Sequence, residues 1–396
     1  MKRLVVVLFL LAIPFPLRAQ QTVWSEKPTP IMPIPDVQQL PFIKELPDPF
    51  DRGDGQRIKT QGDWKQQRER LKALLLFYQY GHLPPPPGNV RQIGVYSRAS
   101  ADGRARHEHI LLSCGPRGGL EFSLDLLVPQ NKMGPFPVIL TGDMGETPIP
   151  DEVVGRGYIL ARFDRTRFAP DTDSRVSGLY GLYPDFDGGA LAAWAWGYSR
   201  AVDYLLTRPD IDSKRIAFAG HSRGGKAVLL AGALDDRIAL TVPAQSGTGG
   251  ASPYRIGGKN SESLAKITGR FGYWFHPRLK SFVGREERLP FDQHFLLSLV
   301  APRSLLMLSG RQDPYMNPDS TNASFLAAKQ VFGFLRAENK IGSYVRDGGH
   351  SFGEADWRVM LDFADLQFFG QPTSTNFEGL PVAEETLPFS WRAPRF

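Results

Sequence analysis

The spacing of hydrophobic and polar residues changes near residue 137 of this 396-residue chain. In residues 63–80, apolar side chains recur at the spacing of one helix face, and a glycine follows directly. Three later stretches, at 91–98, 107–113 and 120–128, have strand-like alternation and β-branched residues. The first part of the chain therefore predicts a helix followed by strands that enter a sheet in antiparallel fashion.

From residue 137 onward, short apolar runs alternate with longer segments of helical spacing. The apolar runs predict parallel strands buried on both faces, and they lie at 138–140, 158–161, 216–219, 239–243, 305–308 and 342–345. The segments that predict helices lie at 189–206, 291–300, 324–335 and 355–369. Repeated strand–helix units predict an α/β fold, with a mostly parallel central sheet in a three-layer sandwich.

The N-terminus has the pattern of a targeting segment. Lys2 and Arg3 precede an apolar run at 4–17, and Ala19 supplies a small residue at a cleavage point. This pattern predicts a secretory signal peptide over residues 1–19, because the apolar run is too short for a comfortable membrane span. No cysteine follows closely, so a lipid anchor is not expected. We expect a periplasmic or secreted protein with no stable membrane anchor.

The rest of the chain predicts three further parts. Residues 20–90 are expected to form an N-terminal arm and a helix that packs on the core, 91–372 the main α/β domain, and 373–396 an irregular tail. Cys114 is the single cysteine, which excludes an internal disulfide and cysteine-based metal sites. The formal net charge is +6, but no dense basic run with interleaved aromatic residues appears, so nucleic acid is a poor candidate partner. A monomer is expected by default.

A candidate nucleophile lies at Ser222, in the sequence Gly-His-Ser-Arg-Gly at 220–224. An apolar run at 215–219 precedes it and a small-residue helix pattern at 226–233 follows, which is the strand–turn–helix context of a nucleophile elbow. The hydroxyl would then stand at a helix N-terminus, where a developing anion is favoured. A chance glycine-rich turn is the alternative, and the flanking strand and helix favour a catalytic Ser222.

A serine nucleophile needs a base, and His350 is the best placed of the seven histidines. It follows the last predicted strand, and two glycines before it let the loop bend back over the elbow. In α/β-hydrolases the acid that orients the base lies between serine and histidine along the chain. Asp313, soon after the strand at 305–308, fits that order, although an Asp-Pro pair can also simply begin a turn. The order predicts a Ser222–His350–Asp313 triad.

Two cations follow the candidate serine. Lys226 lies four residues after Ser222, on the same helix face, so it can reach toward the pocket. Arg223 can donate hydrogen bonds to an oxyanion. Both could instead be surface charges, but their position beside a nucleophile favours a substrate with polar or negatively charged groups near its acyl carbon.

These residues lie in segments that resemble carbohydrate esterase family 15, the glucuronoyl esterases. The resemblance runs from about residue 122 to residue 370, and it rests on the segments 193–200, 220–226, 246–251, 273–275, 289–294 and 301–303. It implies an α/β-hydrolase fold without metal or organic cofactor. It also implies hydrolysis of an ester between a 4-O-methyl-glucuronate of xylan and an alcohol of lignin.

The resemblance also implies roles for individual residues. Ser222 and His350 match the nucleophile and the base of the family. Arg223 matches the residue that helps to form the oxyanion hole, and Lys226 matches a residue that contacts sugar hydroxyls. Trp274 lies in a family-like segment, and it is expected to bind substrate.

The chain departs from the family pattern at three positions. Many members carry a catalytic glutamate where this chain has Gln245, so Asp313 must serve as the acid. A sugar-packing tryptophan two residues beyond that acid is replaced by Tyr315, and a sugar-contacting glutamate aligns with Lys259. The hydrolytic residues are therefore present, while the sugar-recognition surface is altered.

Three functions remain open at this stage. The leading hypothesis is a serine esterase for uronate esters of plant cell-wall polysaccharide. An acetyl-xylan or other carbohydrate esterase is the second, since the altered pocket residues would allow it. A catalytically weak carbohydrate-binding relative is the third, favoured by Gln245 and disfavoured by the retained serine, aspartate and histidine.

Overall fold

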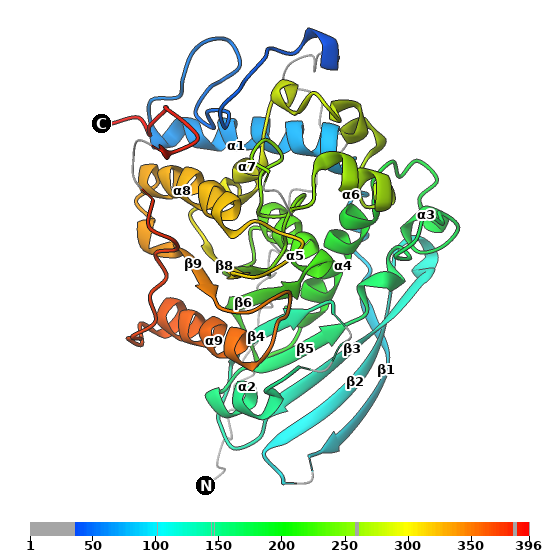
Figure 1. Ribbon diagram of the computed structural model, residues 1–396. Coiled ribbons are helices and arrows are strands. Elements are labelled where there is room, and N and C mark those ends of the chain that lie inside the picture. The colour runs from blue at the N-terminus through cyan, green and yellow to red at the C-terminus, as the bar shows by residue number, and fades with distance from the viewer. Residues whose placement is uncertain are drawn as a thin grey trace, which may run out of the picture.

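The computed structural model describes residues 36–100, 102–143, 145, 147–257, 261–382 and 386–395. Within these residues, one nine-stranded sheet has the strand order β1-β2-β3-β5-β4-β6-β7-β8-β9 (Figure 1). The strands are β1 (Arg91–Ala99), β2 (Ala105–Cys114), β3 (Leu120–Pro129), β4 (Phe136–Thr141), β5 (Ile159–Phe163), β6 (Ile211–His221), β7 (Leu240–Ala244), β8 (Ser304–Gly310) and β9 (Ile341–Arg346). The predicted signal peptide at 1–19 lies outside the described residues.

The sheet is antiparallel at one side and parallel across the rest. β1 pairs with β2, β2 with β3, and β3 with β5, all antiparallel. The neighbours from β5 through β4, β6, β7 and β8 to β9 are all parallel. The expected α/β fold with antiparallel N-terminal strands is therefore confirmed.

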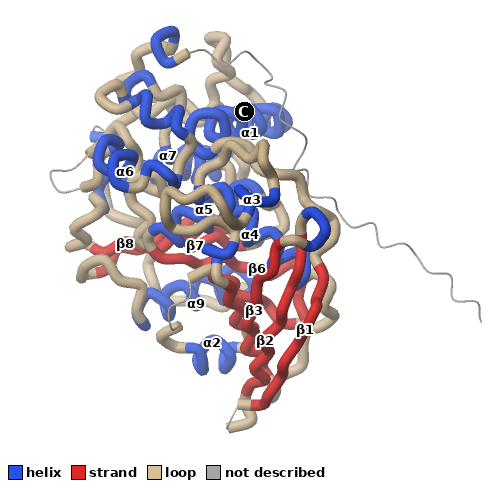
Figure 2. The backbone as a smooth tube through the Cα atoms, turned by 90° about the vertical axis from the view of Figure 1, so that its right-hand side faces the viewer, coloured by secondary structure: helices blue, strands red, loops and turns tan. Residues whose placement is uncertain are grey.

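Helices cover both faces of the parallel part of the sheet (Figure 2). The helices are α1 (Gln61–Leu75), α2 (Pro150–Arg156), α3 (Leu179–Leu182), α4 (Ala190–Leu205), α5 (Arg223–Leu234), α6 (Leu264–Arg270), α7 (Gln293–Ser298), α8 (Pro318–Phe334) and α9 (Glu354–Phe369). Apolar residues of α2 and α9 share one buried cluster, and those of α4, α5, α7 and α8 share the other. Adjacent residues of β4 face opposite clusters, as the two-residue period of a strand requires.

The element boundaries differ from expectation where a polar residue begins an element. Helix α8 starts at Pro318, six residues before the expected start at 324, because the side chain of Asn317 accepts a hydrogen bond from the Asp319 amide at 3.0 Å. Hydrophobic spacing could not locate this start, because the first turn of α8 is polar. The expected helix at 63–80 is α1 followed by one wider helical turn (Leu76–Tyr80) that ends at Gly81.

The described ends of the chain lie side by side at one end of the molecule (Figure 1). The indole nitrogen of Trp391 donates to the carbonyl of Leu46 at 2.7 Å, and the Leu46 amide donates to the carbonyl of Pro388 at 3.0 Å. Phe50 is fully buried, and its ring lies 6.1 Å from that of Trp391. The described part of the chain contains no helix that is long and apolar enough to span a membrane.

Candidate active site

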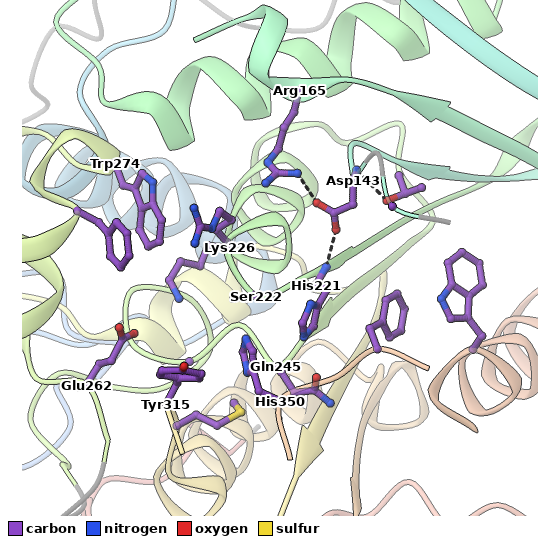
Figure 3. A pocket seen from close by; sticks show the side chains of 18 of the residues that line it. Asp143, Arg165, His221, Ser222, Lys226, Gln245, Glu262, Trp274, Tyr315 and His350 are labelled. Carbon is purple, nitrogen blue, oxygen red and sulfur yellow. Dashed lines mark hydrogen bonds and ion pairs between the residues drawn. The ribbon is translucent and has the colours of Figure 1, made fainter. Parts of the chain in front are cut away.

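The carboxyl ends of the six parallel strands meet at one pocket, which is where open α/β sheets place their ligands (Figure 3). The cavity has a volume of about 550 Å³. Each parallel strand is followed by a residue of this site: Arg165 after β5, Asp143 after β4, Ser222 after β6, Gln245 after β7, Asp313 after β8 and His350 after β9. Asp313 contacts the lining residue His350, and the other five line the cavity themselves. The topology therefore brings together residues as far apart as Asp143 and His350, which are separated by about half the length of the chain.

Ser222 lies in a strained turn between β6 and α5. Its backbone has φ 54° and ψ −118°, a conformation that a residue with a side chain rarely adopts. The Ser222 amide donates to the carbonyl of Ala244 at 2.9 Å, which fixes the turn to β7. A Cβ atom at Gly220 would lie 2.6 Å from the carbonyl oxygen of Gly224, so only glycine fits there. This is the geometry of a nucleophile elbow, with the serine at the first turn of α5.

His350 and Asp313 are paired beside Ser222. The His350 Nδ1 atom lies 2.6 Å from Asp313 Oδ2, and the other carboxylate oxygen accepts the Tyr315 amide at 2.8 Å. The Asp313 side chain is fully buried. A Cβ atom at Gly310 would meet the carbonyl of Gly349 at 2.6 Å, so glycine lets the loops after β8 and β9 approach closely. A buried carboxylate on Nδ1 leaves Nε2 as the nitrogen that can take a proton from a serine hydroxyl.

Arg223 is held at the pocket by charge and by aromatic rings. Its guanidinium donates to Asp171 Oδ2 at 2.6 Å, and its carbon Cζ lies 4.9 Å from the ring centroid of Trp274 and 5.3 Å from that of Phe271. The Trp274 indole donates to the same Asp171 carboxylate at 2.8 Å. Burial alone would raise the pKa of Asp171, but the hydrogen bonds from Trp274 and Arg223 outweigh it and lower that pKa. Arg223 is therefore a fixed cation beside the elbow.

One wall of the pocket carries charged and hydrogen-bonding groups. We call Lys226, Glu262, Trp274 and Tyr315 the polar wall. Figure 3 shows Lys226, Glu262 and Trp274 on one side of the pocket, and His221 with Asp143 on the other. The Lys226 ammonium donates to the carbonyl of Ser246. Burial lowers the pKa of Lys226 to about 8, although Glu262 favours its charged form.

A second group of lining residues carries no charge. We call Thr147, Pro148, Phe352 and Trp357 the apolar wall. The Phe352 ring is stacked on His221 with 6.3 Å between centroids and on Trp357 with 5.2 Å. His221 in turn lies 4.6 Å from the His350 ring, measured between centroids. A continuous row of rings therefore leads from the candidate base to the apolar wall.

Of the three positions that depart from the family pattern, two line the pocket and one lies outside the described residues. Gln245 has φ 43°, is almost fully buried and lines the pocket beside His221, but neither atom of its amide has a hydrogen-bond partner of ordinary geometry. Tyr315 lines the pocket, is 49% exposed and contacts the His350 ring edge to face at 5.0 Å. Lys259 lies outside the described residues. Glu262, three residues later, does line the pocket, so an acidic side chain is available there.

Sequence analysis missed several residues of this site. Asp143, Arg165 and Asp171 lie on loops after strands, and Phe352 follows the candidate base by two positions. An acid directly after a buried strand, as at Asp143, is the signal that could have been used. No group of three or more histidine, cysteine, aspartate or glutamate residues suited to a metal ion occurs in the part of the chain that the structure describes.

A strained serine at the carboxyl edge of a mostly parallel sheet, next to a histidine paired with a buried aspartate, defines an α/β-hydrolase. Residues 117–336 match the family model of the fungal glucuronyl esterases. The chain is 30% identical over 349 residues to a 4-O-methyl-glucuronoyl methylesterase of Schizophyllum commune, covering 84% of each protein.

Solved structures lead to the same family. A carbohydrate esterase family 15 glucuronoyl esterase from Caldicellulosiruptor kristjansonii superposes with a TM-score of 0.76 at 31% identity, covering 90% of this chain and 99% of that one. A glucuronoyl esterase from Sporotrichum thermophile, solved with methyl 4-O-methyl-β-D-glucopyranuronate, has a TM-score of 0.72 at 28% identity, covering 87% and 93%. The chain belongs to the glucuronoyl esterases, carbohydrate esterase family 15.

Proposed function

We propose that this protein is a serine esterase that hydrolyses glucuronoyl esters, releasing a 4-O-methyl-glucuronate carboxyl of xylan from an alcohol of lignin. The observation that carries the proposal is the strained Ser222 beside the His350–Asp313 pair, in a pocket with a polar wall on one side. Within that pair, His350 Nδ1 lies 2.6 Å from Asp313 Oδ2. Related proteins named 4-O-methyl-glucuronoyl methylesterase, and a relative solved with a methyl glucuronate, support this class of substrate.

The proposed reaction is an acyl transfer in two halves. His350 takes the Ser222 hydroxyl proton as the serine oxygen attacks the ester carbonyl, and Asp313 stabilises the imidazolium through Nδ1. The alcohol then leaves with that proton, and an acyl-enzyme remains. Water attacks the acyl-enzyme by the same proton route, which releases the uronic acid and restores the serine.

Arg223 and the first turn of α5 are proposed to hold the oxyanion. The charge develops beside the N-terminus of α5, where the helix dipole is favourable. Asp171 and the rings of Phe271 and Trp274 fix the guanidinium before substrate binds, so little reorganisation is needed in the transition state.

The two walls are suited to different parts of the substrate, the sugar and the alcohol. Hydroxyl groups of a sugar suit the polar wall, because Lys226 is a donor and Glu262 an acceptor, and because the ring of Trp274 lies near both Arg223 and Lys226. The leaving alcohol receives its proton from His350. The row of rings that starts at His350 ends at the apolar wall. Phe352 and Trp357 there are suited to an aromatic alcohol.

The setting of the enzyme is also part of the proposal. The pattern at residues 1–19 supports export and cleavage of a signal peptide, and 91–372 would form the catalytic domain between the N-terminal arm and helix at 20–90 and the tail at 373–396. We infer a monomer that acts on plant cell-wall polysaccharide without a cofactor.

The test compares two ester chemistries on one enzyme. Purified protein is incubated with benzyl glucuronate and, separately, with an acetylated xyloside, and the released alcohol or acetate is measured. Cleavage of the uronate ester at a specificity constant at least tenfold higher supports the proposal. Preferred cleavage of the acetate would establish an acetyl-carbohydrate esterase instead, and no turnover of either ester would favour a carbohydrate-binding relative.

A further inference from the structure

A charged pair beside the elbow has no part in the reaction described above. One oxygen of the Asp143 carboxylate is paired with the Arg165 guanidinium, and the other accepts the His221 amide at 2.8 Å. Figure 3 shows both interactions at the edge of the pocket. Asp143 comes from the loop after β4 and Arg165 from the turn after β5, the strand paired with β4. The pair therefore joins two loops to the residue that precedes Ser222.

The Asp143 carboxylate lies directly against the first turn of α5. A Cβ atom at Gly224 would be 2.2 Å from Asp143 Oδ1 and 2.5 Å from Oδ2, so the carboxylate occupies the space that any side chain at this position would need. Gly224 is the second residue of α5, next to the amide of Arg223. In the α/β-hydrolase arrangement this amide, which follows the nucleophile, faces the oxyanion. A negative charge on Asp143 thus lies close to the place where the reaction develops negative charge.

Uncompensated, that carboxylate would oppose the reaction. Like charges this close together in a partly buried site repel strongly enough to slow the reaction about 10- to 100-fold. The repulsion would act on the oxyanion and hardly on the neutral ester, so it would raise the barrier without weakening substrate binding.

The Arg165 guanidinium is fixed in the position that cancels this charge. It also donates to the carbonyl of Gly142 at 3.0 Å, and its carbon Cζ lies 4.9 Å from the ring centroid of the fully buried Trp194. The Arg165 side chain is 11% exposed, so solvent screens the pair weakly. Three contacts from two segments, the loop after β4 and helix α4, hold the cation against Asp143.

We propose that Asp143 is a positioning residue of the elbow and that Arg165 is its obligatory charge partner, which keeps the carboxylate from repelling the oxyanion. Asp143 fixes the backbone before Ser222 through the His221 amide, and Arg165 makes that carboxylate tolerable during catalysis. This inference rests on the proposed esterase function.

The test is a double-mutant cycle on the uronate ester, measured once wild-type turnover of that ester has been shown. R165M keeps an apolar stem over Trp194 but leaves the carboxylate uncompensated, so kcat should fall about 10- to 100-fold with KM nearly unchanged. D143N keeps an oxygen that accepts the His221 amide, so its kcat should fall less than that of R165M. The D143N/R165M double variant, with both charges gone, should recover most of the lost kcat.

Two further variants separate charge from packing. R165K keeps the cation and should retain more kcat than R165M. R167M removes an exposed arginine two residues away, whose guanidinium donates to the carbonyl of Glu121 at 3.4 Å, and it should behave as wild type. Melting temperatures are recorded for every variant, because a structural role would lower stability and activity together.

The sign of the coupling decides the outcome. A double variant that is more active than R165M supports the proposal. A double variant as impaired as R165M, or worse, overturns it, and so does an R165M enzyme with unchanged kcat. If wild type does not turn over the uronate ester at all, the proposed function fails first, and this result is distinguishable from a failed cycle.

Discussion

The reactive centre and the polar wall of the same pocket are built in different ways. Backbone geometry and short hydrogen bonds fix Ser222, His350 and Asp313, each just beyond the end of a parallel strand. In the polar wall, Tyr315 is about half exposed, and the Lys226 ammonium donates to the carbonyl of Ser246. We therefore expect the fold to determine where bonds break, and the side chains of the polar wall to determine which sugar is bound. Changes in the reactive centre should lower kcat, and changes in the polar wall should raise KM.

The largest effect after loss of the serine itself is expected at the buried acid. Asp313→Asn leaves the packing intact but removes the charge that stabilises the His350 imidazolium, so kcat should fall about 10⁴-fold, as for the acid of other serine triads. Steady-state kinetics on benzyl glucuronate measure this loss. A decrease of less than about tenfold would show that another group orients His350.

Gln245 offers a way to sharpen that result. The family resemblance places it where many members carry a catalytic glutamate, it is buried beside His221, and its amide lacks a hydrogen-bond partner of ordinary geometry. In the Asp313→Asn background, Gln245→Glu supplies a carboxylate to the same side of the site and should restore kcat at least tenfold. Gln245→Met in that background is the matched control, which should restore nothing. Equal activities of the two double variants would exclude position 245 as a site for the acid.

The polar wall should respond to pH through Lys226. Because burial lowers the pKa of Lys226 to about 8, its ammonium loses a proton as the pH rises through that value. A hydrogen bond from a charged group is worth about 1.5–3 kcal/mol, so KM for the uronate ester should rise by up to about tenfold from pH 7 to about pH 9, the limit that this titration sets. Lys226→Met should have a high KM that does not vary over this interval. A pH-independent KM in wild type would contradict a substrate contact by Lys226.

The smallest effect is expected at the apolar wall. Phe352→Ala removes the ring between His221 and Trp357, and aromatic contacts of this kind contribute about 0.5–1.5 kcal/mol. The specificity constant for a benzyl ester should fall about 2- to 10-fold, while that for the methyl ester should stay within about twofold. Deacylation is common to both esters, so the ratio of specificity constants reports the alcohol alone. A cyclohexylmethyl ester serves as the control for size without aromaticity.

An unchanged benzyl-to-methyl ratio in Phe352→Ala would place the alcohol elsewhere in the pocket. An equal loss on both esters would indicate a packing role for the ring beside His221. Either result would remove the apolar wall as the binding site of the alcohol and leave only the proposed contacts of the polar wall with the sugar.

Much of this architecture could be predicted from sequence because it is local. The elbow is five consecutive residues between a strand and a helix, and its strain follows from glycines and a serine at fixed spacing. His350 and Asp313 could be selected because parallel strands deliver the following residues to one edge of the sheet. The alternation of strands and helices was sufficient for the sheet itself.

The residues that could not be predicted are set by contacts between distant segments. Asp171 is recognisable as a partner of Arg223 only once the loop after β5 lies against α5, and Arg165 only once Asp143 lies beside it. Glu262 cannot be selected from sequence, because no motif fixes the register of the loop after β7. In each case the residue can be read from the sequence, but the residue that it contacts is known only from the folded structure.

The most direct test of the account is the rate of benzyl alcohol release from benzyl glucuronate by wild type and Ser222→Ala, with both proteins shown to be folded by their melting curves. The account predicts turnover by wild type and a decrease of about 10⁵-fold or more in Ser222→Ala, to the background left by the oxyanion hole and substrate binding. Release at a comparable rate by both proteins would contradict a reaction that passes through Ser222.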